Sequence, residues 1–357
     1  MNKIQYKIIA ISLIVLMLFT NVHPVQCATV ASTKYGYTQL NKTEKTVYTQ
    51  ILSALKKQKK EIHFKNFNDY KKLPKIYATL LADNPDIFWI KTAASGCKYK
   101  GKKVLDTYMQ FTYSMSKDKM KDTQKKLQNK ANALLKGMPK DSDYEKVKFI
   151  YEQVIDSVSY DYVTTSKKEN QLITSAMLKG KSVCAGYTKM YTYLLQKAGI
   201  PCMMLSGKAD NQSHAWNVVK VDGKWYYSDV TWGDRENKNS EYVTDIEDYT
   251  SHIYMLEPAS DFKIDHKLSS TYVSLPICNS NKSEYFHKEG LYFTEFTAKQ
   301  RQIVQDKIDE GETFEIRCFV DGITSAARNY LYTLDGVYGL NFDDNRNIIT
   351  VFVQDED

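Results

Sequence analysis

Apolar residues recur every three to four positions in several stretches of the chain, which is the spacing of amphipathic helices. The helices predicted in this way cover residues 43–60, 70–82, 116–136, a stretch capped by Asp141 or Ser142, 185–198, 297–309 and 322–332. Runs rich in β-branched and aromatic residues predict strands at 87–91, 104–113, 202–206, 214–221, 224–230, 290–293 and 313–320, and a closing hairpin of 336–342 with 347–353. This mixture, without internal repeats, predicts an α+β protein.

Changes in the pattern divide the chain into four predicted parts. Residues 1–27 form an N-terminal leader, 28–140 a helix-rich α+β region, 141–270 a central region, and 271–357 a small α+β unit. The first of the folded parts contains no motif that suggests chemistry, so the interest lies in the central region.

The leader has the pattern of a secretory signal. Lys3 and Lys7 precede an apolar run from Ile8 to Phe19, and Val25-Gln26-Cys27-Ala28 offers a cleavage point after Cys27 or Ala28. The run is short for a membrane span, so no stable span is expected after cleavage. The sequence therefore predicts a secreted or cell-surface protein of a Gram-positive-type bacterium. Two alternatives are a lipid anchor on Cys27 and a leader that stays uncleaved.

Composition narrows the function classes. Apolar residues make up 43% of the chain and charged residues 25%, and the mean hydropathy of −0.48 excludes a multi-span transporter. Only 7 prolines and 15 glycines among 357 residues exclude a collagen-like or low-complexity chain. A net charge of +7, partly carried by the leader, is too weak to argue for nucleic acid as a partner.

Cysteine usage points to a free thiol. Once Cys27 has left with the leader, an odd number remains in a compartment that permits disulfides: Cys97, Cys184, Cys202, Cys278 and Cys318. Neither a CxxC motif nor a Cys/His cluster with zinc spacing occurs, so we expect neither a metal nor another cofactor. Cys202 falls on a predicted core strand and is expected to be a buried small hydrophobe.

Cys184 lies where a loop gives way to the predicted helix 185–198. Backbone N–H groups at a helix N-terminus, together with the helix dipole, favour a thiolate, which is the nucleophilic form of cysteine. Cys184 is therefore a candidate nucleophile. The alternative is a small buried residue that packs the start of the helix.

Asp222-Gly223 predicts a two-residue hairpin turn between the strands 214–221 and 224–230. In that register His214 faces Thr231, and Asp229, two residues before Thr231, lies on the same face as a diagonal neighbour of His214. A histidine and an aspartate can close such a diagonal with a hydrogen bond, which predicts an imidazole oriented by a carboxylate. The alternative is a surface histidine beside a solvated aspartate.

These residues and their surroundings resemble the transglutaminase-like superfamily. The matching segments are Cys184-Ala-Gly-Tyr, Gly199-Ile-Pro201, Gly207, His214-Ala-Trp-Asn-Val and Gly223-Lys-Trp-Tyr-Tyr-Ser-Asp229-Val-Thr-Trp232. With Tyr160-Asp161-Tyr162 upstream and a tail to His266, the resemblance covers about 141–270. It implies a papain-like core in which Cys184 is the nucleophile, His214 the general base and acid, and Asp229 the residue that orients His214. His266 is expected to be structural.

The chain also departs from that family. Animal members have a tryptophan well upstream of the cysteine that helps to hold the oxyanion, whereas no tryptophan lies between Trp89 and Trp216 here. The backbone N–H of Cys184 supplies one donor, and Tyr160 is the candidate for the second, with a core tyrosine as the alternative. Trp216 and Trp232 flank the predicted triad as candidate cleft walls, or core contacts. No acidic calcium site is recognisable.

The resemblance implies an exported cysteine enzyme that attacks amide bonds of a protein or peptide substrate through a thioester. The cell wall is one place where such a substrate could be found, and no nucleic acid is expected as a partner. Water would resolve the thioester by hydrolysis, whereas an amine would produce a cross-link; we favour hydrolysis. The alternative class is a catalytically inert transglutaminase-like binding module at the cell surface.

Overall fold

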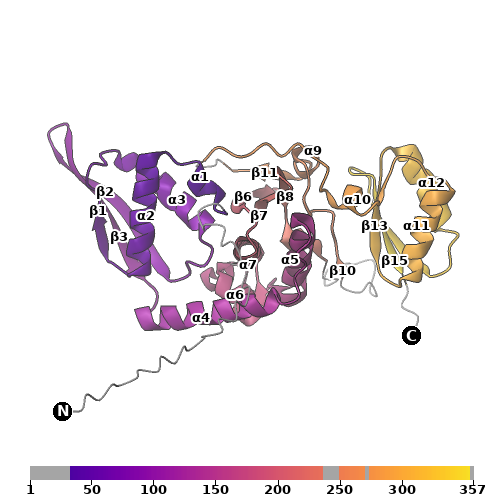
Figure 1. Ribbon diagram of the computed structural model, residues 1–357, viewed down its shortest axis with the longest axis horizontal. Helices are drawn as coiled ribbons and strands as arrows, with labels where there is room; N and C mark the ends of the chain where they lie inside the picture. The colour runs from indigo at the N-terminus through magenta and orange to yellow at the C-terminus, as the bar shows by residue number, and fades with distance from the viewer. Residues whose placement is uncertain (1–32, 236–248, 270–272, 354–357) are drawn as a thin grey trace, which may run out of the picture.

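The computed structural model describes residues 33–235, 249–269 and 273–353. The predicted leader, 1–27, lies outside these residues. The described parts follow one another along the long axis of the molecule, from the N-terminal helices and long hairpin through a central sheet to the C-terminal unit (Figure 1). Helices and strands mix in all three, which confirms the α+β class.

The N-terminal part pairs helices with a three-stranded sheet of order β1-β3-β2. Its elements are α1 (Tyr35–Thr38), α2 (Lys42–Lys56), β1 (Glu61–His63), η1 (Tyr70–Lys72), α3 (Leu73–Asp83), β2 (Ile90–Lys100), β3 (Lys103–Tyr113) and α4 (Lys117–Leu134). The predicted strand 87–91 is misplaced, because β2 starts later and pairs with β3 over most of its length. β2 contains small and polar residues such as Ala93, Ser95 and Gly96, so its sequence lacks the β-branched and aromatic pattern typical of a strand. The short β1 was also missed.

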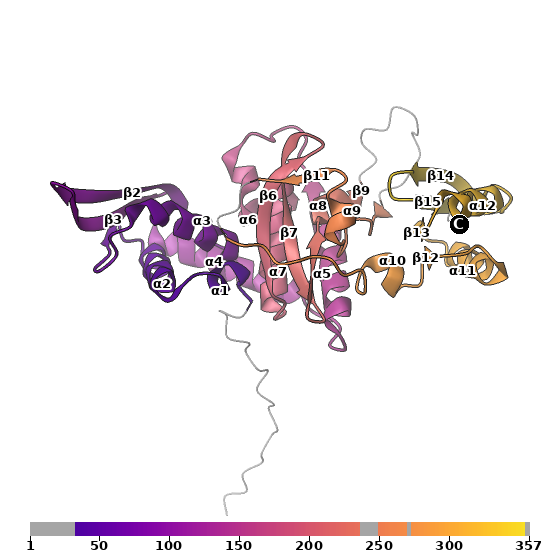
Figure 2. The ribbon, with the colours of Figure 1, turned by 90° about the horizontal axis from the view of Figure 1, so that it is seen from above.

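The central part is a four-stranded sheet of order β11-β6-β7-β8. Its strands are β6 (Cys202–Ala209), β7 (Gln212–Val221), β8 (Lys224–Ser228) and β11 (His266–Leu268). The helices and short strands around it are α5 (Asp143–Ser157), β4 (Ser159–Tyr160), η2 (Lys168–Gln171), α6 (Ile173–Lys179), β5 (Lys181–Ser182), α7 (Cys184–Lys197), α8 (Val230–Gly233), β9 (Asp234–Arg235), β10 (Tyr249–Thr250) and α9 (Ala259–Phe262). Figure 2 shows α7 and α5 against the sheet.

Alternation along the strands gives the sheet two buried faces. Cys202, Val219 and Tyr226 belong to the apolar cluster that contains α5 and α7. Leu205, Trp216 and Val218 point to the other side and join the cluster that contains Phe262. Cys202 is fully buried, as predicted.

The register predicted from Asp222-Gly223 is confirmed for the paired strands. Val221 faces Lys224, and the pairing continues in step to Asn217 and Ser228. Both turn residues have positive φ angles, of 48° and 78°, as a primed hairpin turn requires.

The predicted end of the second strand is wrong, and so is the pairing of His214 with Thr231. β8 ends at Ser228 because the Asp229 side chain accepts hydrogen bonds from the backbone N–H groups of Thr231 and Trp232 and so caps α8. On the opposite edge of β7, His214 faces Gly207 of β6. Two further elements, α6 and the edge strand β11, were missed because each is short.

Gly186, in the first turn of α7, has no room for a side chain. A Cβ atom there would lie 1.8 Å from Ser182 Oγ, and that hydroxyl is held 2.6 Å from the Asn170 carbonyl oxygen. We therefore expect Gly186→Ala to lower the free energy of unfolding by about 1–3 kcal/mol. Urea denaturation measures this, with Gly322→Ala as the matched control, since that glycine, also near a helix start, has open space around it. Equal stability of the two variants would contradict the expectation.

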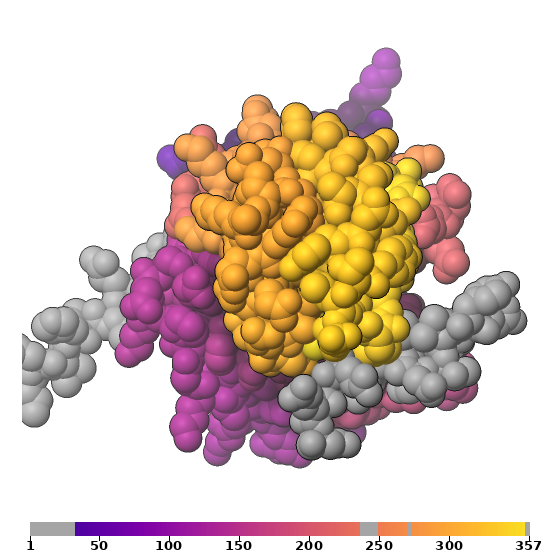
Figure 3. Space-filling view, turned by 90° about the vertical axis from the view of Figure 1, so that its right-hand side faces the viewer, coloured from indigo at the N-terminus to yellow at the C-terminus, as the bar shows by residue number. Residues whose placement is uncertain are grey.

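The C-terminal part is a four-stranded sheet of order β12-β13-β15-β14 with two longer helices. Its elements are α10 (Tyr285–Lys288), β12 (Tyr292–Phe293), α11 (Ala298–Asp309), β13 (Phe314–Cys318), α12 (Asp321–Leu331), β14 (Val337–Asp343) and β15 (Ile348–Val353). Apart from α10, which is short and was missed, these elements agree with the predicted order of strands and helices. The unit, coloured orange to yellow, forms the end of the molecule that faces the viewer in Figure 3.

Among the described residues, no helix is both long and apolar enough to cross a bilayer.

Candidate active site

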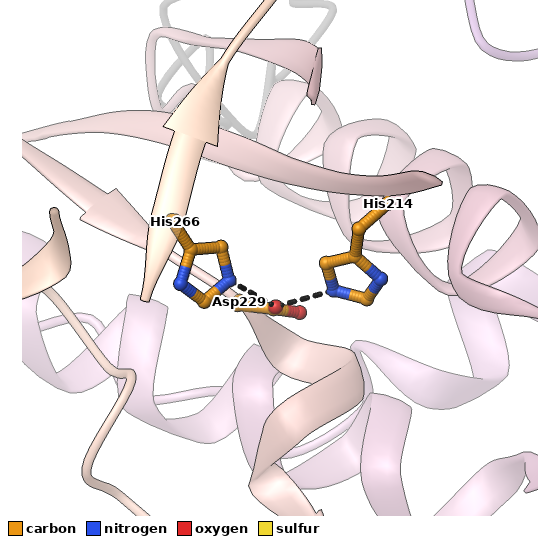
Figure 4. A group of neighbouring side chains, drawn as sticks. All are labelled: His214, Asp229 and His266. Carbon is orange, nitrogen blue, oxygen red and sulfur yellow. Dashed lines mark hydrogen bonds and ion pairs between the residues drawn. The ribbon is translucent and has the colours of Figure 1, made fainter. Parts of the chain in front are cut away.

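His214 and Asp229 form a short, buried hydrogen bond. Their Nε2 and Oδ2 atoms lie 2.6 Å apart, and the Asp229 side chain is fully buried (Figure 4). Burial alone disfavours the imidazolium, but the Asp229 charge and hydrogen bond outweigh it and raise the pKa of His214 to about 10. Burial also opposes the Asp229 carboxylate, yet the charge of His214 holds its pKa well below the usual range. The pair therefore favours imidazolium with carboxylate at neutral pH.

Asp229 is held by bonds on both of its oxygens. Oδ1 accepts from the backbone N–H groups of Thr231, at 3.0 Å, and Trp232, at 3.3 Å. Oδ2 accepts from His214 and, at 3.1 Å, from Nε2 of His266. A carboxylate fixed in this way presents one defined lone-pair direction to His214.

Cys184 is the first residue of α7, and Val183 precedes it as the N-cap in extended conformation. Its side chain is partly exposed and forms a hydrogen bond with the His214 side chain. This bond contributes to the raised pKa of His214. Because Asp229 engages Nε2 of His214, Nδ1 is the ring nitrogen left for the sulfur. The fold thus brings together the three residues that the sequence predicted as a triad.

Tyr160 ends the short strand β4, whose partner β5 leads directly into Cys184. The Tyr160 hydroxyl is within hydrogen-bonding reach of the Cys184 backbone N–H. Burial and the nearby Cys184 raise the pKa of Tyr160 to about 12, so the hydroxyl keeps its proton and remains a donor at neutral pH. The two groups predicted as oxyanion donors are therefore neighbours.

The two flanking tryptophans have different places. Trp216 is buried beneath His214, with ring centroids 6.2 Å apart, and belongs to the core of the sheet. Trp232 lies 5.5 Å from the His214 ring and lines the adjacent cleft. Trp216 is therefore a core residue, whereas Trp232 forms part of the cleft wall.

His266 contacts the pair more closely than the sequence suggested. It lies on the edge strand β11, opposite Ala209, and reaches the oxygen of Asp229 that also bonds His214. The strand is too short to give a hairpin signal, so pattern reasoning could not place this histidine. The resemblance to the family tail was the one signal for it.

His214, Asp229 and His266 also have the composition of a metal site, since one ligand atom of each lies within 4.8 Å of the others. Their facing atoms, however, already bond to one another at 2.6 and 3.1 Å. We therefore assign them to a hydrogen-bond network.

A cleft of about 1000 Å³ opens beside His214 and Trp232. Polar and charged side chains from two parts of the chain line it, including Asp210, Arg235 and Asp265 of the central part and residues 342–346 of the C-terminal part. The candidate site thus faces a cleft to which the C-terminal unit contributes a wall.

Part of this chain is similar to known proteins. A family model described as the transglutaminase-like superfamily matches residues 132–230. The chain is 29% identical over 106 residues to the kyphoscoliosis peptidases of Homo sapiens and Mus musculus, which covers 26% of this chain and 16% of each relative. The match thus spans less than a fifth of the length of these relatives.

Two solved structures are also similar. One, called a TGase, is 18% identical, with a TM-score of 0.30 and coverage of 51% of this chain and 54% of the other. The second, described as a candidate cysteine protease from Cytophaga hutchinsonii, is 13% identical, with a TM-score of 0.26 and coverage of 40% and 65%. The family match over residues 132–230 shows that the chain has a transglutaminase-like core, and members of that superfamily are generally cysteine enzymes.

Proposed function

We propose that this protein is an exported cysteine enzyme that hydrolyses amide bonds of proteins or peptides through Cys184, His214 and Asp229. The observation that carries the proposal is the 2.6 Å bond between His214 and the fully buried Asp229, next to a cysteine at a helix start. A nucleophile, a base and a group that orients the base are the parts that covalent acyl transfer requires.

In the proposed reaction the Cys184 thiolate attacks the amide carbonyl carbon. The carbonyl oxygen gains the negative charge and is stabilised by the Cys184 N–H and the Tyr160 hydroxyl. The C–N bond then breaks as Nδ1 of His214 gives its proton to the leaving nitrogen, which leaves a thioester. His214 next takes a proton from water, the oxygen of which attacks the thioester carbon, and the C–S bond breaks to release the acid.

The cleft favours water over an amine as the second reactant. Its lining is largely polar, and bulk water, at about 55 M, far exceeds any protein lysine in concentration. Trp232 contributes an aromatic wall, but amine transfer needs a site that excludes water until the amine arrives. We therefore expect hydrolysis to exceed transfer.

Incubation of the protein with casein and a fluorescent primary amine at millimolar concentration tests this expectation. We expect ammonia or new peptide termini to form in excess over amine incorporation, and none of these products with Cys184→Ala. Incorporation in excess would replace hydrolysis by amine transfer and leave the triad assignment standing. A lack of all three products, together with a Cys184 that reacts with iodoacetamide no faster than free cysteine, would support the inert binding module instead.

Export is part of the proposal and rests on residues 1–27. The protein recovered from the medium or the cell surface of a producing bacterium should begin after Cys27 or Ala28. N-terminal sequencing reads this directly, and a mature protein that starts at Met1 would contradict it.

A further inference from the structure

A turn of the C-terminal unit inserts a buried arginine next to the candidate active site. Arg346, 4% exposed, lies between β14 and β15, where Asp343 Oδ1 accepts from its backbone N–H at 3.1 Å. Its guanidinium bonds Asp343 Oδ2 at 3.1 Å, Glu257 Oε1 at 3.3 Å and Asp265 Oδ2 at 2.9 Å. A further bond at 3.3 Å goes to the backbone oxygen of Asp261. The arginine thus joins the last hairpin of the chain to the segment that precedes β11.

Asp265 forms hydrogen bonds with both Arg346 and His266. Its Oδ2 atom, bonded by Arg346, also accepts from the Tyr254 hydroxyl at 2.8 Å, and its Oδ1 atom lies 2.5 Å from Nδ1 of His266. Nε2 of the same ring faces Asp229. Because ionised carboxylates only accept hydrogen bonds, this geometry favours a proton on each ring nitrogen of His266: burial lowers the pKa of His266, but the bonds to Asp229 and Asp265 outweigh burial and raise it.

The surroundings of His266 suit a fixed cation. Its side chain is fully buried, and its ring stacks on Phe262 with centroids 4.0 Å apart. Trp232 and Trp216 add further ring contacts at 4.5 and 5.1 Å. Aromatic faces attract a desolvated cation, and rings on several sides leave the imidazole little freedom to turn.

We infer that Arg346, Asp265 and His266 are positioning residues for the triad. Arg346 fixes Asp265 through a hydrogen bond, and Asp265 fixes His266 in the same way. His266 in turn donates a hydrogen bond to the Asp229 oxygen that also accepts from His214. The inference rests on the proposed function, because it gives these residues a task only if His214 works with Cys184. It makes the C-terminal unit a structural part of the active site and not merely a neighbour of it.

The test uses the full-length protein and needs no substrate. Alkylation of Cys184 by iodoacetamide, followed by mass spectrometry from pH 5 to 9, reports the thiolate that the His214 imidazolium supports, because an unassisted thiol is mostly protonated at the acid end of this range. We expect Arg346→Gln to slow the alkylation at pH 6 by about 10- to 100-fold, the usual effect of losing a positioning contact. Arg346→Lys, which keeps the charge, should recover part of the rate.

Arg317→Gln is the matched control. Arg317, on β13 of the same unit, bonds Asp261 of the central part at 2.7 Å and Glu284 of its own unit at 3.4 Å, so its loss also breaks an ion pair between the C-terminal unit and the central part. Neither ion pair involves Asp265 or His266, and we expect Arg317→Gln to leave the alkylation profile within about twofold of wild type while it lowers the melting temperature. Equal slowing by both variants would mean general loosening and would overturn the inference.

Asp265→Asn provides a second route, should Arg346→Gln not fold. It keeps the shape of the side chain but removes the charge that His266 and Arg346 share, and the same slowing at pH 6 is expected. An alkylation profile like that of the wild type in Arg346→Gln or in Asp265→Asn would overturn this inference but leave the proposed function standing. A wild-type protein in which Cys184 reacts no faster than free cysteine would overturn the proposed function, and the inference with it.

Discussion

Cys184→Ala is expected to lower kcat by about 10⁶-fold, because the covalent route then has no nucleophile. The variant should stay folded, since the side chain is small and only partly buried. Release of ammonia or new termini from casein measures the activity, and thermal melting checks the fold. Cys97→Ala is the matched control: that thiol is also partly buried but lies on β2, and its loss should leave kcat unchanged. Retention of activity by Cys184→Ala would refute the assignment.

The reactivity of the thiols toward iodoacetamide should also distinguish Cys184 from the other cysteines, and this measurement needs no substrate. Burial raises the pKa of Cys202 well above its usual range, that of Cys278 to about 12 and that of Cys318 to about 11. These three thiols should therefore react slowly in the folded protein. Limited iodoacetamide labelling should mark Cys184 first, and faster labelling of Cys97 would contradict the proposal.

Asp229→Asn should have the second largest effect, a decrease in kcat of about 10⁴-fold. The amide keeps an oxygen for the N–H groups of Thr231 and Trp232, so α8 retains its cap. It cannot stabilise the His214 imidazolium, and its NH₂ group faces the two histidine nitrogens that Asp229 Oδ2 now accepts from. The loss should be smaller than for Cys184→Ala because the nucleophile remains.

The pH profile separates this effect from general damage. The pKa of His214 is raised to about 10 by Asp229, so the imidazolium persists through neutral pH and is lost only as the pH rises through that value. The alkaline limb of kcat/KM, which reports pKa values of the free enzyme, should accordingly lie near pH 10 in the wild type and move toward the ordinary histidine range, about 6.5, in Asp229→Asn. Lys220→Gln, a change on the same strand as His214 but away from the site, should leave the limb in place. An unmoved limb in Asp229→Asn would contradict the assignment.

Local signals were sufficient for much of the fold and for the centre of the site. The Asp222-Gly223 turn defined the register of β7 and β8 because the two-residue loop leaves one pairing, and that pairing is present. The long amphipathic helices and the C-terminal order of elements followed from periodicity in the same way. The sequence therefore places His214 and Asp229 together, although the strand register is only part of the reason, since Asp229 lies just past the end of β8.

Several of the errors come from dependence on distant partners. β2 is stabilised by pairing with β3 and carries small and polar residues that give no strand pattern of their own. The alternatives for Trp216 and Trp232 could not be decided from their spacing to the triad, because burial depends on Phe262 and the Tyr254 segment, far along the chain.

The sequence by itself determined the α+β class, the hairpin that joins His214 to Asp229 and the cysteine at a helix start, because each depends on residues that are close in the chain. Only the tertiary structure placed Cys184 against His214, His266 on Asp229 and Arg346 on Asp265. Arg346 lies in a turn of another sheet, and its charge is tolerated in the interior because Asp265, Glu257 and Asp343 surround it. Such a contact has no local pattern, since it arises from the packing of two units that fold from separate stretches of the chain.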